Sequence, residues 1–140
     1  MAKLTKDFFT DGEVLILGYP LKDDPSMKMI LQAFQRGSIA VYAMNPNAEG
    51  DREVKIYKSF AELPKVPRCA YIYLEKEEIT PWISQMKENG VQRVLFHSKK
   101  DVEPSDVDAC RKTGLETAIA CPLMLLGGGI HKFHKLLAGV

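Results

Sequence analysis

Five short apolar runs recur along the chain, separated by longer segments of mixed polarity. Within each run nearly all residues are apolar, without the alternation expected of a strand with one face in water. Such runs are typical of parallel strands that are covered on both faces. The sequence therefore predicts strands at 14–17, 39–44, 70–74, 94–96 and 117–121, with a shorter strand and a helical turn within 53–64.

The first helix is predicted by the spacing of four apolar residues after the first strand. They follow i, i+3, i+4 and i+7 and share one helix face: Met27, Ile30, Leu31 and Phe34. We expect Ser26 to cap this helix, because a serine hydroxyl can accept a backbone N–H of the first turn. Gly37 is expected to end it.

Three further helices are predicted after the later strands. Thr80 is the expected N-cap of a helix that ends at Gly90, another helix ends at Gly114, and the last covers 130–138. Strands that alternate with helices form βαβ units with right-handed crossovers. The expected fold class is α/β, a Rossmann-like doubly wound, mainly parallel sheet of about five strands with helices on both faces. The 140 residues are expected to form one domain.

Composition narrows the class of function. The formal net charge is +1, from 19 Lys and Arg against 18 Asp and Glu residues. Proteins that bind nucleic acid or acidic membranes carry a basic excess, so we expect neither partner. The N-terminus lacks the apolar stretch of a secretory signal. The chain has three cysteines without CxxC spacing: Cys69, Cys110 and Cys121. We expect them to be reduced thiols in a cytoplasmic protein.

The loop after the first strand is the first candidate site, since doubly wound sheets bind ligands beyond the carboxyl ends of their strands. Gly18 ends this strand, but a GxGxxG fingerprint would need glycine where Pro20 and Asp23 stand, and no P-loop is present. What remains is a glycine turn followed by a helix N-terminus. Its N–H groups and dipole can hold a pyrophosphate. The alternative is a tight turn and a cap without a ligand.

No acidic residue follows the second strand, where a nicotinamide dinucleotide site has an Asp or Glu for the ribose hydroxyls. Asn45 and Pro46 stand there, followed by Arg52, Lys55 and Lys58. These basic residues favour a nucleotide with a phosphate on its ribose over plain NAD. The alternative is a solvated basic loop.

Together these motifs resemble the small CoA-binding domain family, whose members are single-domain Rossmann-like proteins similar to the CoA-binding part of the succinyl-CoA synthetase alpha subunit. The matching features are the strand that ends at Gly18, the Pro-Ser pair at 25–26, the triplet at 44–46, the stretch 56–64 and the late Cys121. The resemblance implies non-catalytic binding of coenzyme A or a related adenine nucleotide. It implies the following binding residues: Gly18, Tyr19, Pro20, Pro25, Ser26, Asn45, Pro46 and Lys58.

The chain departs from the family pattern just before the first helix. The family commonly has a basic residue there, whereas this chain has Asp23 and Asp24. Their carboxylates would repel a pyrophosphate unless they point outward or Lys22 and Lys28 offset them. The second hypothesis is therefore a ligand-free interaction or scaffold module on the same fold, within a homo-oligomer or with an unknown protein partner.

A third hypothesis is a Cys/His enzyme that acts on a CoA thioester. Cys121 and His97 are both expected at carboxyl ends of strands, where an imidazole could lower the pKa of the thiol. A buried cysteine and a surface histidine are the alternative. His131 and His134 are spaced i, i+3 without the HExxH pattern, so no metal is expected. The glycine run at 126–130 could form an anion nest or a simple connection.

Overall fold

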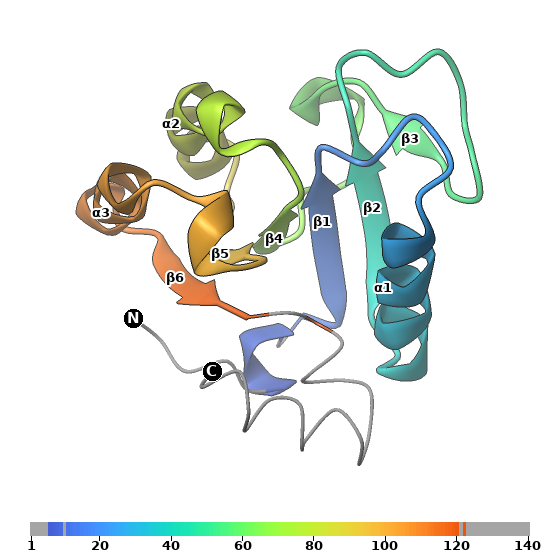
Figure 1. Cartoon of the computed structure of the whole chain (residues 1–140), viewed down its shortest axis with the longest axis horizontal. Helices are drawn as coiled ribbons and strands as arrows, with labels where there is room; N and C mark the ends of the chain where they lie inside the picture. The colour runs from blue at the N-terminus through green and yellow to red at the C-terminus, as the bar shows by residue number, and fades with distance from the viewer. Residues whose placement is uncertain (1–5, 10, 121, 123–140) are drawn as a thin grey trace.

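The strands form one parallel sheet that follows the classical order of a Rossmann fold. The computed structural model describes residues 6–9, 11–120 and 122. In this part of the chain six strands pair in the order β3-β2-β1-β4-β5-β6, all parallel (Figure 1). They are β1 (Glu13–Leu17), β2 (Ala40–Met44), β3 (Ile56–Tyr57), β4 (Cys69–Ile72), β5 (Arg93–Phe96) and β6 (Glu116–Ile119). The predicted fold class is confirmed, and the expected short strand, β3, brings the number to six.

Helices cover both faces of this sheet. The described part contains α1 (Pro25–Arg36), α2 (Thr80–Glu88) and α3 (Pro104–Thr113), together with the 3-10 turns η1 (Lys6–Phe9), η2 (Phe60–Glu62), η3 (Lys76–Glu78) and η4 (Lys99–Asp101). Successive residues of a strand point to opposite faces. Val14 and Ile16 of β1 accordingly pack in the core beneath α1, whereas Leu15 and Leu17 pack with α2 and α3.

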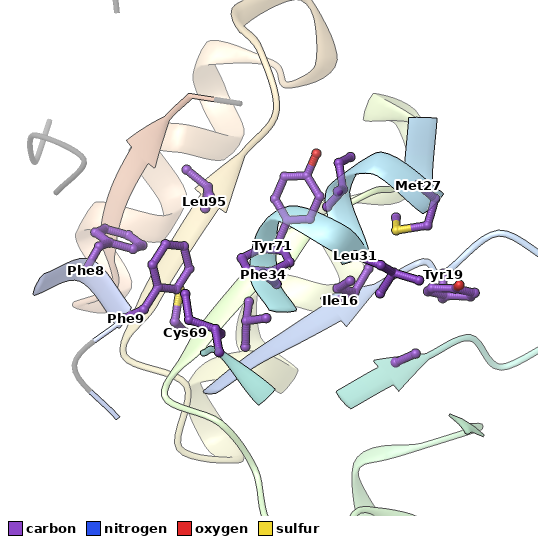
Figure 2. Close-up of a cluster of buried hydrophobic side chains, with 14 of the residues drawn as sticks. Phe8, Phe9, Ile16, Tyr19, Met27, Leu31, Phe34, Cys69, Tyr71 and Leu95 are labelled. Carbon is purple, nitrogen blue, oxygen red and sulfur yellow. The ribbon is translucent and has the colours of Figure 1, made fainter. Parts of the chain in front are cut away.

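An aromatic row anchors α1 on the sheet. Phe34 of α1 is fully buried between Phe9 and Tyr71, with ring centroids 5.5 and 6.2 Å away in edge-to-face arrangements (Figure 2). This geometry suits aromatic quadrupoles. The row holds the last turn of α1 on the strands, while the buried Met27 and Ile30 hold its first turns beside the carboxyl end of β1.

Two predicted helix caps are wrong. The N-cap of α1 is Asp24, whose carboxylate accepts the N–H of Met27, and Ser26 lies inside the first turn. Proline favours the first helical position, so Pro25 places the cap at residue 24. Thr80 is already helical, and its hydroxyl donates to the buried Asp106 of α3 at 2.8 Å instead of capping α2.

The predicted helix ends agree better with the structure. Gly90 and Gly114 adopt left-handed φ values of 100° and 94° directly after α2 and α3. Gly37 caps α1 with an ordinary φ of −82°, and the left-handed residue there is Ser38, at 59°. The helix expected over 130–138 lies outside the described residues. None of the described helices is both long and apolar enough to cross a membrane.

Candidate functional site

The candidate site lies where the strand order reverses, between β1 and β4. From β1 the chain continues outward to β2 and β3, and it then returns to β4 on the other side of β1. Crevices of this kind hold ligands in doubly wound sheets. The segments that follow β1 (18–24), β2 (45–55) and β4 (73–79) all lie at this carboxyl edge (Figure 1).

Gly18 makes the first turn possible in two ways. Its φ of 90° is in the left-handed region, and a Cβ there would lie 2.7 Å from Leu74 Cδ2 and 2.9 Å from the carbonyl oxygen of Tyr73. The N–H groups of Gly18 and Tyr19 both donate to the carbonyl oxygen of Met44, at 2.9 and 3.1 Å. The turn is therefore attached to the end of β2 while it passes close to the end of β4.

Asn45 attaches the end of β2 to the same turn. Its Nδ2 donates to the carbonyl oxygen of Tyr19 at 2.9 Å, and its Oδ1 accepts the N–H of Asn47 at 2.9 Å. Its own N–H donates to the carbonyl oxygen of Tyr57 in β3. Both polar atoms of the Asn45 side chain thus form hydrogen bonds with the backbone. Through these and its own N–H, Asn45 connects the first turn, the segment after β2 and the end of β3.

The segment 45–55 is also fastened to the first loop by side chains. Tyr19 is fully buried in the core beneath α1 (Figure 2), and its hydroxyl donates to Glu53 Oε1 at 2.7 Å. Burial, followed by this hydrogen bond, raises the pKa of Tyr19, and the same bond is the main reason that the pKa of Glu53 is lowered. Arg52 donates to the carbonyl oxygen of Leu21 at 2.9 Å. The buried side chain of Tyr19 therefore anchors the loop after β1 in the core.

Asp24 occupies the N-terminus of α1. Its Oδ1 accepts the N–H of Met27 at 2.9 Å, and its Oδ2 accepts the hydroxyl of Tyr73 at 3.0 Å. Pro25 has no N–H, and the N–H of Lys28 donates to the carbonyl oxygen of Asp24. Among the described residues, the N–H of Ser26 is therefore the one amide of this first turn that has no protein acceptor.

The charges around this helix end are largely paired. Lys28 forms an exposed ion pair with Asp23 at 2.6 Å, which lowers the pKa of Asp23 and offsets its charge. Asp24 is held instead by the two hydrogen bonds described above. Lys55 lies over the ring of Tyr57, 5.2 Å from its centroid, whereas Lys58 is exposed at the end of β3.

The predicted binding residues are only partly brought together. Hydrogen bonds join three of them: Gly18 and Tyr19 donate to the same carbonyl oxygen of Met44, and Asn45 donates to the carbonyl oxygen of Tyr19. The others line the same edge with their side chains half-buried or exposed: Pro20, Pro25, Ser26, Pro46 and Lys58. Tyr73 and Glu53 were not identified from the sequence. Their partners lie 49 and 34 positions away in the chain, so no local pattern could have revealed them.

The candidate enzyme residues are not assembled by the described part of the chain. His97 Nδ1 lies 2.6 Å from the hydroxyl of the buried Tyr71, at the carboxyl end of β5. Cys121, His131, His134 and the glycine run at 126–130 lie outside the described residues, which contain no cluster of metal-ligating side chains.

Two other cysteines are buried on opposite faces of the sheet. Burial raises the pKa of the Cys69 thiol and raises that of Cys110 to about 11. Because the thiolate is the reactive form, both are poor nucleophiles in the folded protein.

Solved structures share this fold over most of the chain. Prb, described as the PH1109 protein redesigned for binding, is 16% identical, with a TM-score of 0.71 over 96% of this chain and 90% of its own. A hypothetical protein from Pyrococcus horikoshii OT3 is 15% identical, with a TM-score of 0.69 over 97% and 94%. Cell-free ID.343 from Thermus thermophilus is 13% identical, with a TM-score of 0.70 over 92% and 94%. At these identities the likeness shows the fold.

The sequence itself shows the family. No curated protein matches the chain, but the model of a CoA binding domain matches residues 13–127. This range begins at β1 and includes the turn at Gly18, the N-terminus of α1 and the Asn-Pro pair after β2. The chain therefore belongs to the CoA-binding domain family.

Proposed function

We propose that this protein binds coenzyme A, or a related adenine nucleotide, without catalysis at the carboxyl edge of its sheet. The observation that carries the proposal is the junction of the first turn with the end of β2. Gly18 and Tyr19 donate to Met44, and Asn45 donates back to Tyr19. Two of the family's motifs thus form one preorganised edge at the switch point, which is where such sheets bind nucleotides.

Each predicted residue has a definite role in this proposal. The adenosine lies near Asn45 and Pro46, and the exposed Lys58 meets a phosphate of the ligand. The N–H and hydroxyl of Ser26 receive a phosphate at the N-terminus of α1, where the helix dipole favours negative charge. The half-buried Pro20 and the exposed Pro25 form the rim of the loop.

Calorimetry tests this proposal directly. We expect heat on titration of the purified protein with CoA or acetyl-CoA, and a Kd raised at least about tenfold in Asn45→Ala. Asn89→Ala is the matched control. The Asn89 side chain also donates to a backbone carbonyl oxygen, that of Gln85, but it lies at the C-terminal end of α2, away from the carboxyl edge of the sheet. No heat with CoA, acetyl-CoA, NAD or ADP at near-millimolar concentration would contradict the proposal.

The alternative is a scaffold module that has kept the fold and lost the ligand. It is favoured by the first turn of α1, where the carboxylate of Asp24 already accepts an amide that a phosphate could use. The two functions are distinguished by mass spectrometry of small molecules released from freshly purified, denatured protein. CoA that copurifies in stoichiometric amount would exclude the scaffold function.

A further inference from the structure

We propose that Asp24 is a specificity-determining residue, which lowers the affinity of this site for ligand phosphates at the N-terminus of α1. The inference rests on the proposed function, because it concerns the same edge of the sheet. The structural basis is a carboxylate that the protein's own contacts hold at the place where a nucleotide phosphate would otherwise meet the helix.

Two hydrogen bonds from different elements hold this carboxylate. The N–H of Met27 in α1 reaches Oδ1 at 2.9 Å, and the hydroxyl of Tyr73, just beyond β4, reaches Oδ2 at 3.0 Å. The two donors lie on opposite sides of the switch point. Asp24 is itself half-buried, and turning its carboxylate toward solvent would break both bonds. The negative charge is therefore a fixed part of this edge of the sheet.

The helix offers little to a phosphate once Asp24 is in place. An uncapped helix N-terminus presents several free N–H groups to an anion. Here Pro25 has none, the amide of Met27 is taken by Asp24, and Ser26 supplies the one amide left in the described structure. A phosphate bound at this point would gain one amide and face a carboxylate.

Neighbouring cations compensate only in part. Lys28 is paired with Asp23, and Arg52 donates to the carbonyl oxygen of Leu21 and lies 3.7 Å from Glu53. Lys22 is exposed and forms no hydrogen bond or ion pair with another described residue. These three cations, Lys22, Lys28 and Arg52, are thus matched in number by three carboxylates, those of Asp23, Asp24 and Glu53. A phosphate at Ser26 therefore binds less tightly than it would without the carboxylate of Asp24, and most of the binding energy comes from the nucleoside and from phosphates that lie away from α1.

The test compares two variants that remove the same charge from adjacent positions. Asp24→Asn keeps the size of the side chain, and its amide oxygen can still accept the N–H of Met27. Asp23→Asn is the matched control, and it also releases Lys28 from its ion pair. If only long-range charge mattered, the control would gain as much phosphate affinity as Asp24→Asn, or more.

Calorimetry with adenosine, ADP and CoA gives the readout. We expect Asp24→Asn to bind ADP and CoA about tenfold more tightly than the wild type, with adenosine changed less than about twofold. Asp23→Asn should gain clearly less. The inference is overturned if Asp24→Asn gains nothing, if adenosine gains equally, or if the control matches it. Should Asp24→Asn fold poorly by circular dichroism, Asp24→Ser replaces it, since serine is also a good N-cap.

The outcomes separate this inference from the proposed function. If the wild type binds CoA and Asp24→Asn gains no affinity, the inference alone fails. If the wild type binds no CoA but Asp24→Asn does, the proposed function fails and the inference stands. Absence of binding in every protein at millimolar ligand refutes both.

Discussion

Replacing Gly18 with alanine tests the close approach of the first turn to β4. The added methyl group would lie 2.7 Å from Leu74 Cδ2 and 2.9 Å from the carbonyl oxygen of Tyr73. The leucine methyl can move aside, but the carbonyl belongs to backbone that is held by the bond from the Tyr73 N–H to Leu17, at 2.8 Å. The turn therefore has to shift away from the strand, or β4 has to bend.

Two costs contribute to the expected loss of stability. A left-handed conformation costs an alanine about 1–2 kcal/mol relative to glycine. Overpacking against atoms that cannot retreat costs roughly 1–3 kcal/mol. We therefore expect Gly18→Ala to lower the free energy of unfolding by roughly 2–5 kcal/mol, a large part of the ~5–15 kcal/mol typical of a domain.

Two other glycines provide controls in urea unfolding experiments. Gly12 has a φ of 68° and Gly50 has no left-handed φ, and neither has an atom within 4 Å of an added Cβ. Gly12→Ala should lose only the conformational cost of about 1–2 kcal/mol, and Gly50→Ala should be near neutral. If Gly18→Ala lost no more stability than Gly12→Ala, the described packing of the turn on β4 would be refuted.

Three further outcomes are expected from the core and the first loop. Phe34→Ala should lower the free energy of unfolding by about 3–5 kcal/mol in urea titrations, because the ring is fully buried; a loss below 1 kcal/mol would contradict the packing. The hydrogen bond from Tyr19 lowers the pKa of Glu53, so its stabilisation is present above the usual glutamate pKa of about 4.3 and is lost as the pH falls through the lowered value. Tyr19→Phe should therefore show a smaller loss of thermal stability below pH 4.3 than the wild type, and an equal loss would refute this linkage. Cys69 and Cys110 should resist iodoacetamide in the folded protein and react in urea, because burial raises the pKa of both thiols; peptide mass spectrometry showing rapid native labelling would contradict their burial.

The strands and the fold class could be predicted from the sequence because a parallel strand covered on both faces is apolar nearly throughout. The residues 14–17 are all buried in β1, and their alternate side chains serve two different cores. The same reasoning works for the helices, where Phe34 and its apolar neighbours mark the buried face. β3 has only two residues, which is too short for its pattern alone to show how it pairs.

The details of the candidate site were less predictable, since tertiary contacts decide them. The cap at Asp24 could have been found from Pro25, which favours the first helical position. Thr80 follows no such rule, because its hydroxyl donates to Asp106, 26 positions away. The bond from Tyr73 to Asp24 likewise joins the end of β4 to the N-terminus of α1, which only the fold brings together.

The location of CoA on the protein is the most direct test of this account. In ¹H–¹⁵N correlation spectra of ¹⁵N-labelled protein titrated with CoA, we expect shifts concentrated in the amides of 18–28 and 44–58. The amino edge of the sheet, around Asp11, Arg68 and Arg93, serves as the internal control. The account predicts that this edge stays unperturbed. Shifts centred there, or no shifts at millimolar CoA, would contradict it.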